Sequence, residues 1–169
     1  ITGTMPDDIA DYTTYKYEFS DTMSKGLTYT ANTATIKIGN TDVTSKFTEQ
    51  VKTNDDGSTT VTWSCDNLKN KEDQILKDIT LTKASTVVVT YSAKLNENAV
   101  IGGTGNPNTV NLTYSNNPNN SGKGETGKTP DDKNVVFTYK TVVNKVDQDG
   151  KTPLKGAGFT LQKKVNGTY

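Results

Sequence analysis

The feature that most limits the possible folds is an alternation of aromatic and polar side chains over residues 15–21, which read YKYEFSD. The aromatic residues of this stretch, Tyr15, Tyr17 and Phe19, share one parity. Because successive side chains of a β-strand point to opposite faces of a sheet, the pattern predicts a strand with one buried face. The buried parity continues to Asp21, so a carboxyl group ends an otherwise apolar row.

Other segments repeat this signature, and the composition agrees with it. Further strands are predicted over residues 27–39, 58–65, 86–95 and 109–115. One short helix is predicted over residues 67–81, with Asn67 as its N-cap and with Ile75 and Ile79 in an apolar stripe. The 30 threonines favour strands, and the 17 asparagines favour turns. Only 31% of the residues are hydrophobic, so the sequence predicts an all-β fold with a thin core.

The composition argues against several classes of function. The sequence contains no His, the commonest general base, and Cys65 is its single cysteine, so neither a disulfide nor a cysteine zinc site is expected. All 19 basic residues are Lys and the net charge is zero, which argues against nucleic-acid binding. No apolar run is long enough to span a membrane. The sequence has no phosphate loop or nucleophile elbow, so we expect no cofactor, no bound metal and no enzymatic turnover of a diffusible substrate.

A change in composition divides the chain into two predicted domains. Residues 119–134 are rich in Asn, Gly, Pro, Lys and Asp and nearly free of apolar side chains, which predicts a linker after a first domain of residues 1–118. Beyond the linker, an alternating run ends at Lys145, and a further strand is predicted over residues 158–164. Residues 135–169 are too few to bury a core alone, so we expect them to be the start of a truncated second domain.

Three polar residues, Asp21, Asn108 and Lys145, each lie at the end of an apolar row and share its inward parity. A Lys amine is a nucleophile only when it is neutral, and burial among aromatic side chains lowers its pKa. A buried carboxyl group tends to stay protonated, and it can then polarise an Asn carbonyl and carry a proton to departing ammonia. Together these residue types predict a self-formed Lys–Asn isopeptide bond, which fixed proximity would promote.

Each of these residues also has an ordinary structural interpretation. An Asp after an aromatic strand is often a cap or a turn acceptor, and an Asn at the start of a strand is often a turn residue. A Lys near the end of a strand usually extends its amine into solvent. The parity pattern alone leaves both interpretations open.

Four segments resemble the shaft, or backbone, pilins of sortase-assembled pili in Gram-positive bacteria. They read DYTTYKYEFSDTMSKGLTY, NENAVIGG, NPNTVNLTYSNNP and NKVDQDGKTPLKGAGFTLQKK, and the resemblance covers nearly all of the chain. It implies that residues 1–118 form an immunoglobulin-like β-sandwich of CnaA type, and that residues 135–169 begin a CnaB-type domain. It further implies an extracellular, cell-wall-anchored protein whose partners are other pilin subunits, joined by sortase-made covalent links.

The resemblance also assigns roles to the three polar residues. Asp21 matches the catalytic acid of the CnaA-type domain, and Asn108 is the best match for its bond-forming Asn. Weaker matches for this Asn are Asn106 and Asn111. Lys145 matches the first-strand Lys of the CnaB-type domain, whose other site residues would lie beyond Tyr169. The Lys of the first domain would lie before Ile1, and no sorting signal or pilin motif is present, so we expect a piece of a longer subunit.

The resemblance therefore implies a structural segment of a pilus shaft, stabilised by self-formed Lys–Asn bonds that each form once. An alternative is an adhesin domain with the same sandwich fold, in which loops such as residues 96–108 bind a host matrix ligand. A host surface is then a second candidate partner. The plainest form of the pilus-shaft hypothesis is a spacer domain without a cross-link. A further alternative is a secreted enzyme, and the absence of His argues against it.

Overall fold

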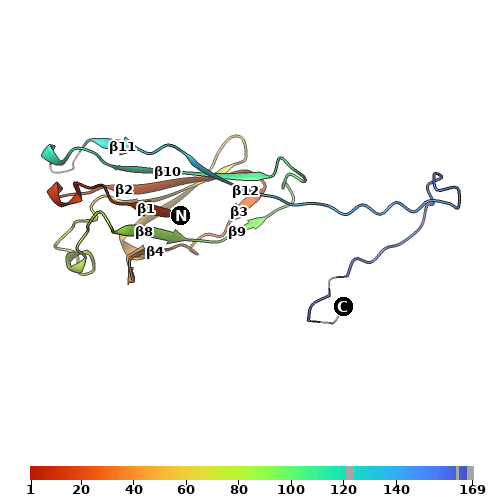
Figure 1. Ribbon diagram of the computed structural model, residues 1–169, viewed down its shortest axis with the longest axis horizontal. Helices are drawn as coiled ribbons and strands as arrows, with labels where there is room; N and C mark the ends of the chain where they lie inside the picture. Colours follow the sequence, from red (N-terminus) through yellow and green to blue (C-terminus); the bar gives the residue numbers. More distant parts are fainter. Residues whose placement is uncertain (121–123, 163, 167–169) are drawn as a thin grey trace. The chain divides into compact units, whose positions relative to one another are not determined.

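The structure of the protein is a computed structural model, and it describes residues 1–120, 124–162 and 164–166. The chain divides into two compact units, Ile1–Thr138 and Tyr139–Tyr169. The first unit consists of two main β-sheets that lie one above the other in Figure 1, and we call it the sandwich. The predicted all-β sandwich is thus confirmed.

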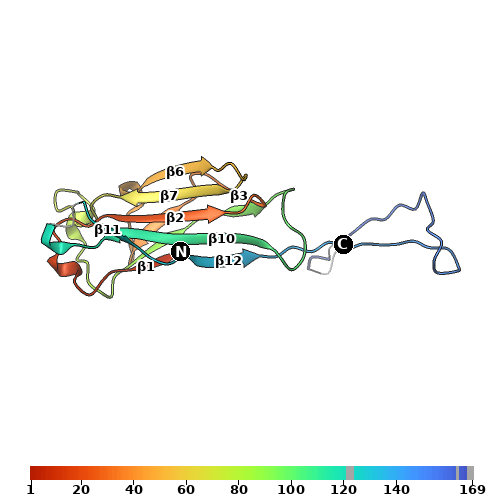
Figure 2. The same cartoon turned by 90° about the horizontal axis from the view of Figure 1, so that it is seen from above.

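The larger sheet has the strand order β11-β10-β2-β7-β6, with β12 also paired to β10. Its strands are β2 (Tyr17–Met23), β6 (Thr48–Thr53), β7 (Thr59–Cys65), β10 (Asn106–Ser115), β11 (Thr126–Lys128) and β12 (Asp132–Val136). Every pairing in this sheet is antiparallel, and Figure 2 shows β6, β7, β2, β10 and β12 side by side. The central position of β2 and β10 keeps one face of each strand inside the sandwich.

The second sheet has the strand order β1-β8-β4-β5, and a separate pair is formed by β3 and β9. These strands are β1 (Thr2–Thr4), β3 (Leu27–Tyr29), β4 (Thr35–Ile38), β5 (Thr41–Asp42), β8 (Thr86–Thr90) and β9 (Ala93–Leu95). Short 3-10 turns lie between strands of the sandwich: η1 (Ile9–Asp11), η2 (Thr44–Lys46), η3 (Leu76–Asp78) and η4 (Pro118–Asn120). The two ends of this sheet are β1 and β5.

The core lies between the two main sheets and follows the predicted alternation. In β2 the side chains of odd number are buried and those of even number are half-buried. Trp63 and Cys65 of β7 and Val87 and Val89 of β8 are also buried. Burying one such apolar side chain contributes about 1.5–3 kcal/mol to folding, so this row of alternating residues accounts for much of the sandwich's stability.

The helix predicted over residues 67–81 is not formed, and only the three-residue 3-10 turn η3 lies in that segment. Side-chain oxygens accept bonds from nearby backbone N–H groups instead: Asn67 from Lys69, Asn70 from Glu72, and Asp73 from Ile75 and Leu76. Such local bonds offer the backbone an alternative to helical ones. The predicted N-cap Asn67 also accepts a bond from the Tyr15 N–H, which fixes this segment to the entry of β2.

Residues 119–134, which are predicted to be a linker, contain β11 and most of β12. Both strands pair with β10, and the sandwich continues to Thr138. The prediction relied on the scarcity of apolar side chains. Strands at the edge of a sheet can be held by backbone bonds with little apolar burial of their own, and β12 is almost entirely exposed.

In residues 139–169 the described part contains no strand longer than an isolated bridge, between Val146 and Pro153. The strands predicted up to Lys145 and over residues 158–164 are therefore not found among the described residues. The large apolar side chains of this unit are exposed, for example Leu161 at 89%. A segment with no second layer to bury its apolar face gains too little to order strands.

Candidate functional site

Asp21 and Asn108 lie on neighbouring strands of the larger sheet and face the interior of the sandwich. The pairing of β2 with β10 puts Asp21 opposite Val110 and Asn108 opposite Met23. The two polar residues are therefore diagonal neighbours on one face of the sheet. Asp21 is fully buried, and Asn108 is half-buried.

A third polar group, the hydroxyl of Tyr91, reaches this pair from the opposite sheet. Tyr91 directly follows β8 and continues the inward parity of Val87 and Val89. Its Oη donates to Asp21 Oδ2 at 2.7 Å and accepts from Asn108 Nδ2 at 2.8 Å. Asn108 Nδ2 also lies 3.3 Å from Asp21 Oδ2. The three side chains thus form a closed triangle of polar atoms that joins both sheets.

The electrostatics of this triangle favour uncharged groups. Burial raises the pKa of Asp21, and the bonds from Tyr91 and Asn108 oppose this shift only in part. Burial likewise raises the pKa of Tyr91, and the neighbouring Asp21 carboxyl raises it further. The buried atoms Asp21 Oδ1 and Asn108 Oδ1 have no hydrogen-bond partner within the part of the chain that the structure describes. Unpartnered polar atoms in a core are costly, so they are expected where a site serves a purpose other than stability.

A cavity of about 370 Å³ lies beside this triangle, between β1 and β10. Its walls include Ile1, Tyr91, Asn108, Val110 and Pro130. The amide of Asn108 is therefore accessible to a further side chain without unfolding of the sandwich. Chemically, the site combines an amide, a carboxyl group that tends to hold its proton, a phenol and a partly apolar space.

The two other asparagines considered from the sequence have different surroundings. Asn106 is buried, and its amide accepts from Val100 N and donates to the carbonyl oxygens of Val100 and Val136. A Cβ atom at Gly26 would collide with Asn106 Oδ1, so Gly26 makes room for this amide. Asn111, on the opposite parity, donates to Asp131 Oδ1 at 2.9 Å. Neither amide contacts Asp21.

Neither Lys16 nor Lys145 is part of this triangle. Lys16 is paired with Glu18 at 3.2 Å on the opposite parity of its strand. Lys145 belongs to the second unit and is exposed, and no ion pair of its amine is found among the described residues. Its backbone carbonyl accepts from Leu154 N. No described residue of the second unit brings an acid and an Asn to Lys145.

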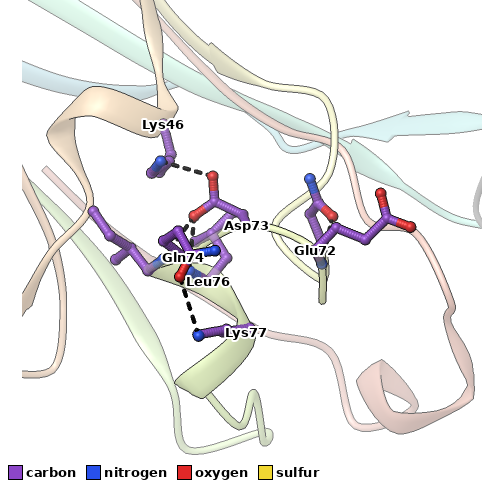
Figure 3. Close-up of polar contacts among 8 residues, drawn as sticks. Lys46, Glu72, Asp73, Gln74, Leu76 and Lys77 are labelled. Atoms are coloured by element: carbon purple, nitrogen blue, oxygen red, sulfur yellow. Dashed lines mark hydrogen bonds and ion pairs between the residues drawn. The ribbon is translucent and has the colours of Figure 1, made fainter.

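The carboxyl group of Asp73, which is paired with Lys46, differs from that of Asp21 in its charge. Lys46 Nζ lies 2.7 Å from Asp73 Oδ2 (Figure 3), with about a fifth of each side chain exposed. The Lys46 bond and the N–H groups of Leu76 and Ile75 lower the pKa of Asp73 to about 2. Asp73 is therefore ionised, and the contact is an ion pair that ties η2 to the segment before η3.

Sequence reasoning singled out Asp21 and Asn108 but missed Tyr91. Like Asp21 and Asn108, Tyr91 carries a polar atom at an inward position at the end of an alternating run. The tyrosine ring fits an apolar row, so the alternation does not distinguish Tyr91 from an ordinary core residue. Within the described residues, no cluster of His, Cys, Asp or Glu could hold a metal ion, and no helix is long and apolar enough to cross a membrane.

Comparison with known proteins identifies relatives of this chain. Residues 7–118 match the family described as Gram-positive pilin backbone subunit 2, Cna-B-like domain. The trypsin-resistant surface T6 protein of Streptococcus pyogenes serotype M6 is 31% identical over 87% of this chain. The solved structure of the T6 backbone pilin of serotype M6 S. pyogenes, described as a modular three-domain protein, is similar with a TM-score of 0.50 at 25% identity, over 89% of this chain.

These matches confirm the resemblance to backbone pilins and differ from one detail of the prediction. The family description calls the matched segment Cna-B-like, whereas the sequence predicted a CnaA-type domain for residues 1–118. The chain spans 28% of the length of the curated relative and 33% of the solved chain. The matched family is one of structural proteins and not of enzymes. The chain belongs to the backbone pilins of Gram-positive bacteria.

Proposed function

We propose that this chain is a load-bearing segment of an extracellular pilus shaft, and that Asn108 forms a Lys–Asn isopeptide bond promoted by Asp21. The observation that carries the proposal is the placement of the Asn108 amide against the buried Asp21 carboxyl and the Tyr91 hydroxyl. A turn asparagine or a capping aspartate would bond to backbone groups, and neither side chain does so. The family supports the shaft role and the cell-surface location.

The register of β1 indicates where the lysine would enter. Ile1 and Val89 exchange two backbone bonds of 2.9 Å, and Ile1 and Gly3 share the inward parity. If the strand continues upstream with the same pairing, the second residue before Ile1 lies opposite Tyr91 and points inward. We propose that this residue is the lysine, and that its side chain occupies the cavity beside Asn108.

The reaction balances without any further reactant. The neutral lysine amine attacks Asn108 Cγ, a new C–N bond forms, and the bond from Cγ to Nδ2 breaks. One amine proton ends on the departing nitrogen, which leaves as ammonia. The acid is regenerated, so the reaction occurs once per site and needs only fixed proximity, an uncharged amine and a proton carrier.

The test is the intact mass of the denatured subunit that contains this chain and its upstream strand. We expect the wild-type subunit to be lighter than its sequence by one ammonia, and a cross-linked peptide to contain Asn108. Asp21→Ala and Asn108→Ala should each restore the full mass. By analogy with the loss of a disulfide, each should also cost about 2–5 kcal/mol of stability.

Asn111→Ala is the matched control, because Asn111 lies on the same strand but faces the other way. It should keep the bond. A bond mapped to Asn106 would correct the assignment of the acceptor. A wild-type subunit of full sequence mass would refute the cross-link while leaving the family unchanged.

The remaining roles are proposals for the whole subunit. We propose that its partners are other pilin subunits, linked covalently by sortase, and that Lys145 supplies the amine of a second bond whose acid and Asn follow Tyr169. A truncated second unit agrees with the exposure of the apolar side chains in residues 139–169. A longer chain that also contains the residues after Tyr169 tests Lys145, because it should lose a second ammonia that maps to that residue.

A further inference from the structure

We propose that Tyr91 is a catalytic residue of the cross-linking reaction, and that its hydroxyl group, not the Asp21 carboxyl, passes the proton directly to the leaving nitrogen of Asn108. The inference rests on the function proposed above and adds a residue that the acid–amide pair alone does not include. In this arrangement Asp21 stands behind Tyr91 and replaces the proton that the phenol gives away.

The distances support this order of groups. Tyr91 Oη is 2.8 Å from Asn108 Nδ2, whereas the nearest Asp21 oxygen is 3.3 Å from it. Tyr91 Oη is in turn 2.7 Å from that same Asp21 oxygen. A proton from Asp21 therefore has a path of two short contacts through Tyr91, against one long direct contact.

The packing of the Tyr91 ring holds its hydroxyl in this position. The ring centroid lies 5.3 Å from that of Trp63 and 5.8 Å from that of Tyr29, and the contact with Tyr29 is edge-to-face. Val89, two residues earlier, is fixed to Ile1 by two backbone bonds. A proton carrier held by aromatic contacts on one side and by a strand on the other needs little reorganisation during the reaction.

The proton transfers follow from the change in geometry at Asn108. In the planar amide the Nδ2 lone pair is delocalised, so Nδ2 donates to Tyr91 Oη. When the amine adds to Cγ, the carbon becomes tetrahedral and Nδ2 gains a localised lone pair. Tyr91 Oη then gives its proton to Nδ2 and takes the carboxyl proton of Asp21. As ammonia leaves, the extra proton of the attacking nitrogen returns to Asp21, and both groups are restored.

The experiment follows bond formation in newly made protein, because a completed bond cannot be reset. The subunit with its upstream strand is made by cell-free synthesis, and loss of ammonia is followed by intact mass against time. Tyr91→Phe removes only the hydroxyl, and we expect bond formation to slow by roughly 10²-fold, a usual contribution of one positioned proton donor. Asp21 can still reach Nδ2 directly, so the reaction should slow but not stop.

Tyr29→Phe is the matched control. Tyr29 belongs to the same aromatic cluster, but its hydroxyl donates to Glu49 Oε2 at 2.8 Å and not to Asp21 or Asn108. It should leave the rate of bond formation unchanged. Equal slowing in both variants would show a general effect of packing and would overturn the role of Tyr91.

Two further outcomes separate this inference from the proposed function. A Tyr91→Phe subunit that forms the bond as fast as the wild type overturns the role of Tyr91 and leaves the cross-link intact. A wild-type subunit that never loses ammonia overturns both.

As a second variant that keeps the ring and the hydroxyl, 3-fluorotyrosine at position 91 provides a more acidic phenol and should speed the reaction. An unchanged rate there would contradict direct proton transfer by Tyr91.

Discussion

Asp21 is a buried acid with one partnered and one unpartnered oxygen, and this controls its charge. An ionised carboxylate in a core is costly unless it is paired with a cation or fully hydrogen-bonded. Val61 and Val110 flank Asp21 on the neighbouring strands. The facing polar groups are the Tyr91 hydroxyl and the Asn108 amide, and among the described residues the Ile1 ammonium is the cation that lowers the pKa of Asp21. The uncharged acid is therefore the form that folding favours.

This preference predicts how the stability of the uncross-linked 169-residue chain depends on pH. Because the pKa of Asp21 is raised in the folded state, the folded protein binds the proton more tightly than the unfolded one. The contribution of Asp21 is fully present below the ordinary pKa of 3.8 and is lost as the pH rises through the raised value. Asp21→Asn should remove this loss, as measured by urea unfolding between about pH 3 and pH 8.

Asp73→Asn gives a control of opposite sign. The pKa of Asp73 is lowered to about 2, so its contribution is present above 3.8 and is lost as the pH falls toward 2. Its substitution should flatten the acid side of the profile and leave the neutral side unchanged. If Asp21→Asn has the same pH profile as the wild type, Asp21 is ionised in the folded protein and cannot serve as the acid.

At the scale of elements, Asn106 joins the loop before β10 to the last strand of the sandwich. Its amide bonds to both backbone groups of Val100 and to the carbonyl of Val136 in β12. Gly102 N donates to Thr138 O at 2.8 Å and adds a second tie between the same two segments. One buried side chain thus fixes a loop and a strand that have few apolar contacts of their own.

We expect Asn106→Ala to cost about 2–3 kcal/mol, because it leaves buried backbone groups without partners. Urea unfolding measures the loss, and hydrogen exchange should show faster exchange of the β12 amides than of those in β2. Asn98→Ala is the control, since Asn98 is exposed in the same loop. Equal protection of β12 in both variants would show that Asn106 does not hold this strand.

The strands that the sequence predicts well are those with a buried face. In β2, β7 and β8 burial alternates along the strand, because successive side chains point to the core and away from it. β11 and β12 escape prediction because backbone bonds to β10, and not side-chain burial, hold them. The segment 67–81 has the apolar content of a helix, but its Asn and Asp side chains bond locally and turn the chain.

The same reasoning explains what could be predicted of the site. Parity places Asp21 and Asn108 on the inner face, and antiparallel pairing of their strands makes them neighbours. Tyr91 comes from the other sheet, and no local pattern states which residues meet across the core. A contact between layers depends on how both sheets stack, which is a property of the whole sandwich and not of any one strand.

At the scale of the whole molecule, the sandwich ends at Thr138 and not at the predicted boundary near residue 118. A chain of residues 1–138 should therefore keep the unfolding free energy of residues 1–169. A chain of residues 1–118 lacks β11 and β12, and the loss of their bonds to β10 should cost about 3 kcal/mol or more. Urea unfolding of the three chains measures both effects. If residues 1–118 are as stable as residues 1–138, the two edge strands add nothing to the fold.

The pairing of β12 with β10 also determines what happens when the chain is pulled from Thr138. β12 runs beside the strand that carries Asn108, so tension first acts on the backbone bonds between these two strands. Once these strands separate, and β11 and residues 109–115 of β10 also detach, residues 109–138 can lengthen to roughly 100 Å before the pull reaches Asn108. The proposed covalent bond at Asn108 would divert the tension into the upstream strand, and the strands from β2 to β8 would then carry no load. With that proposed bond in place, the edge strands would separate under a sudden load and pair again when the load falls.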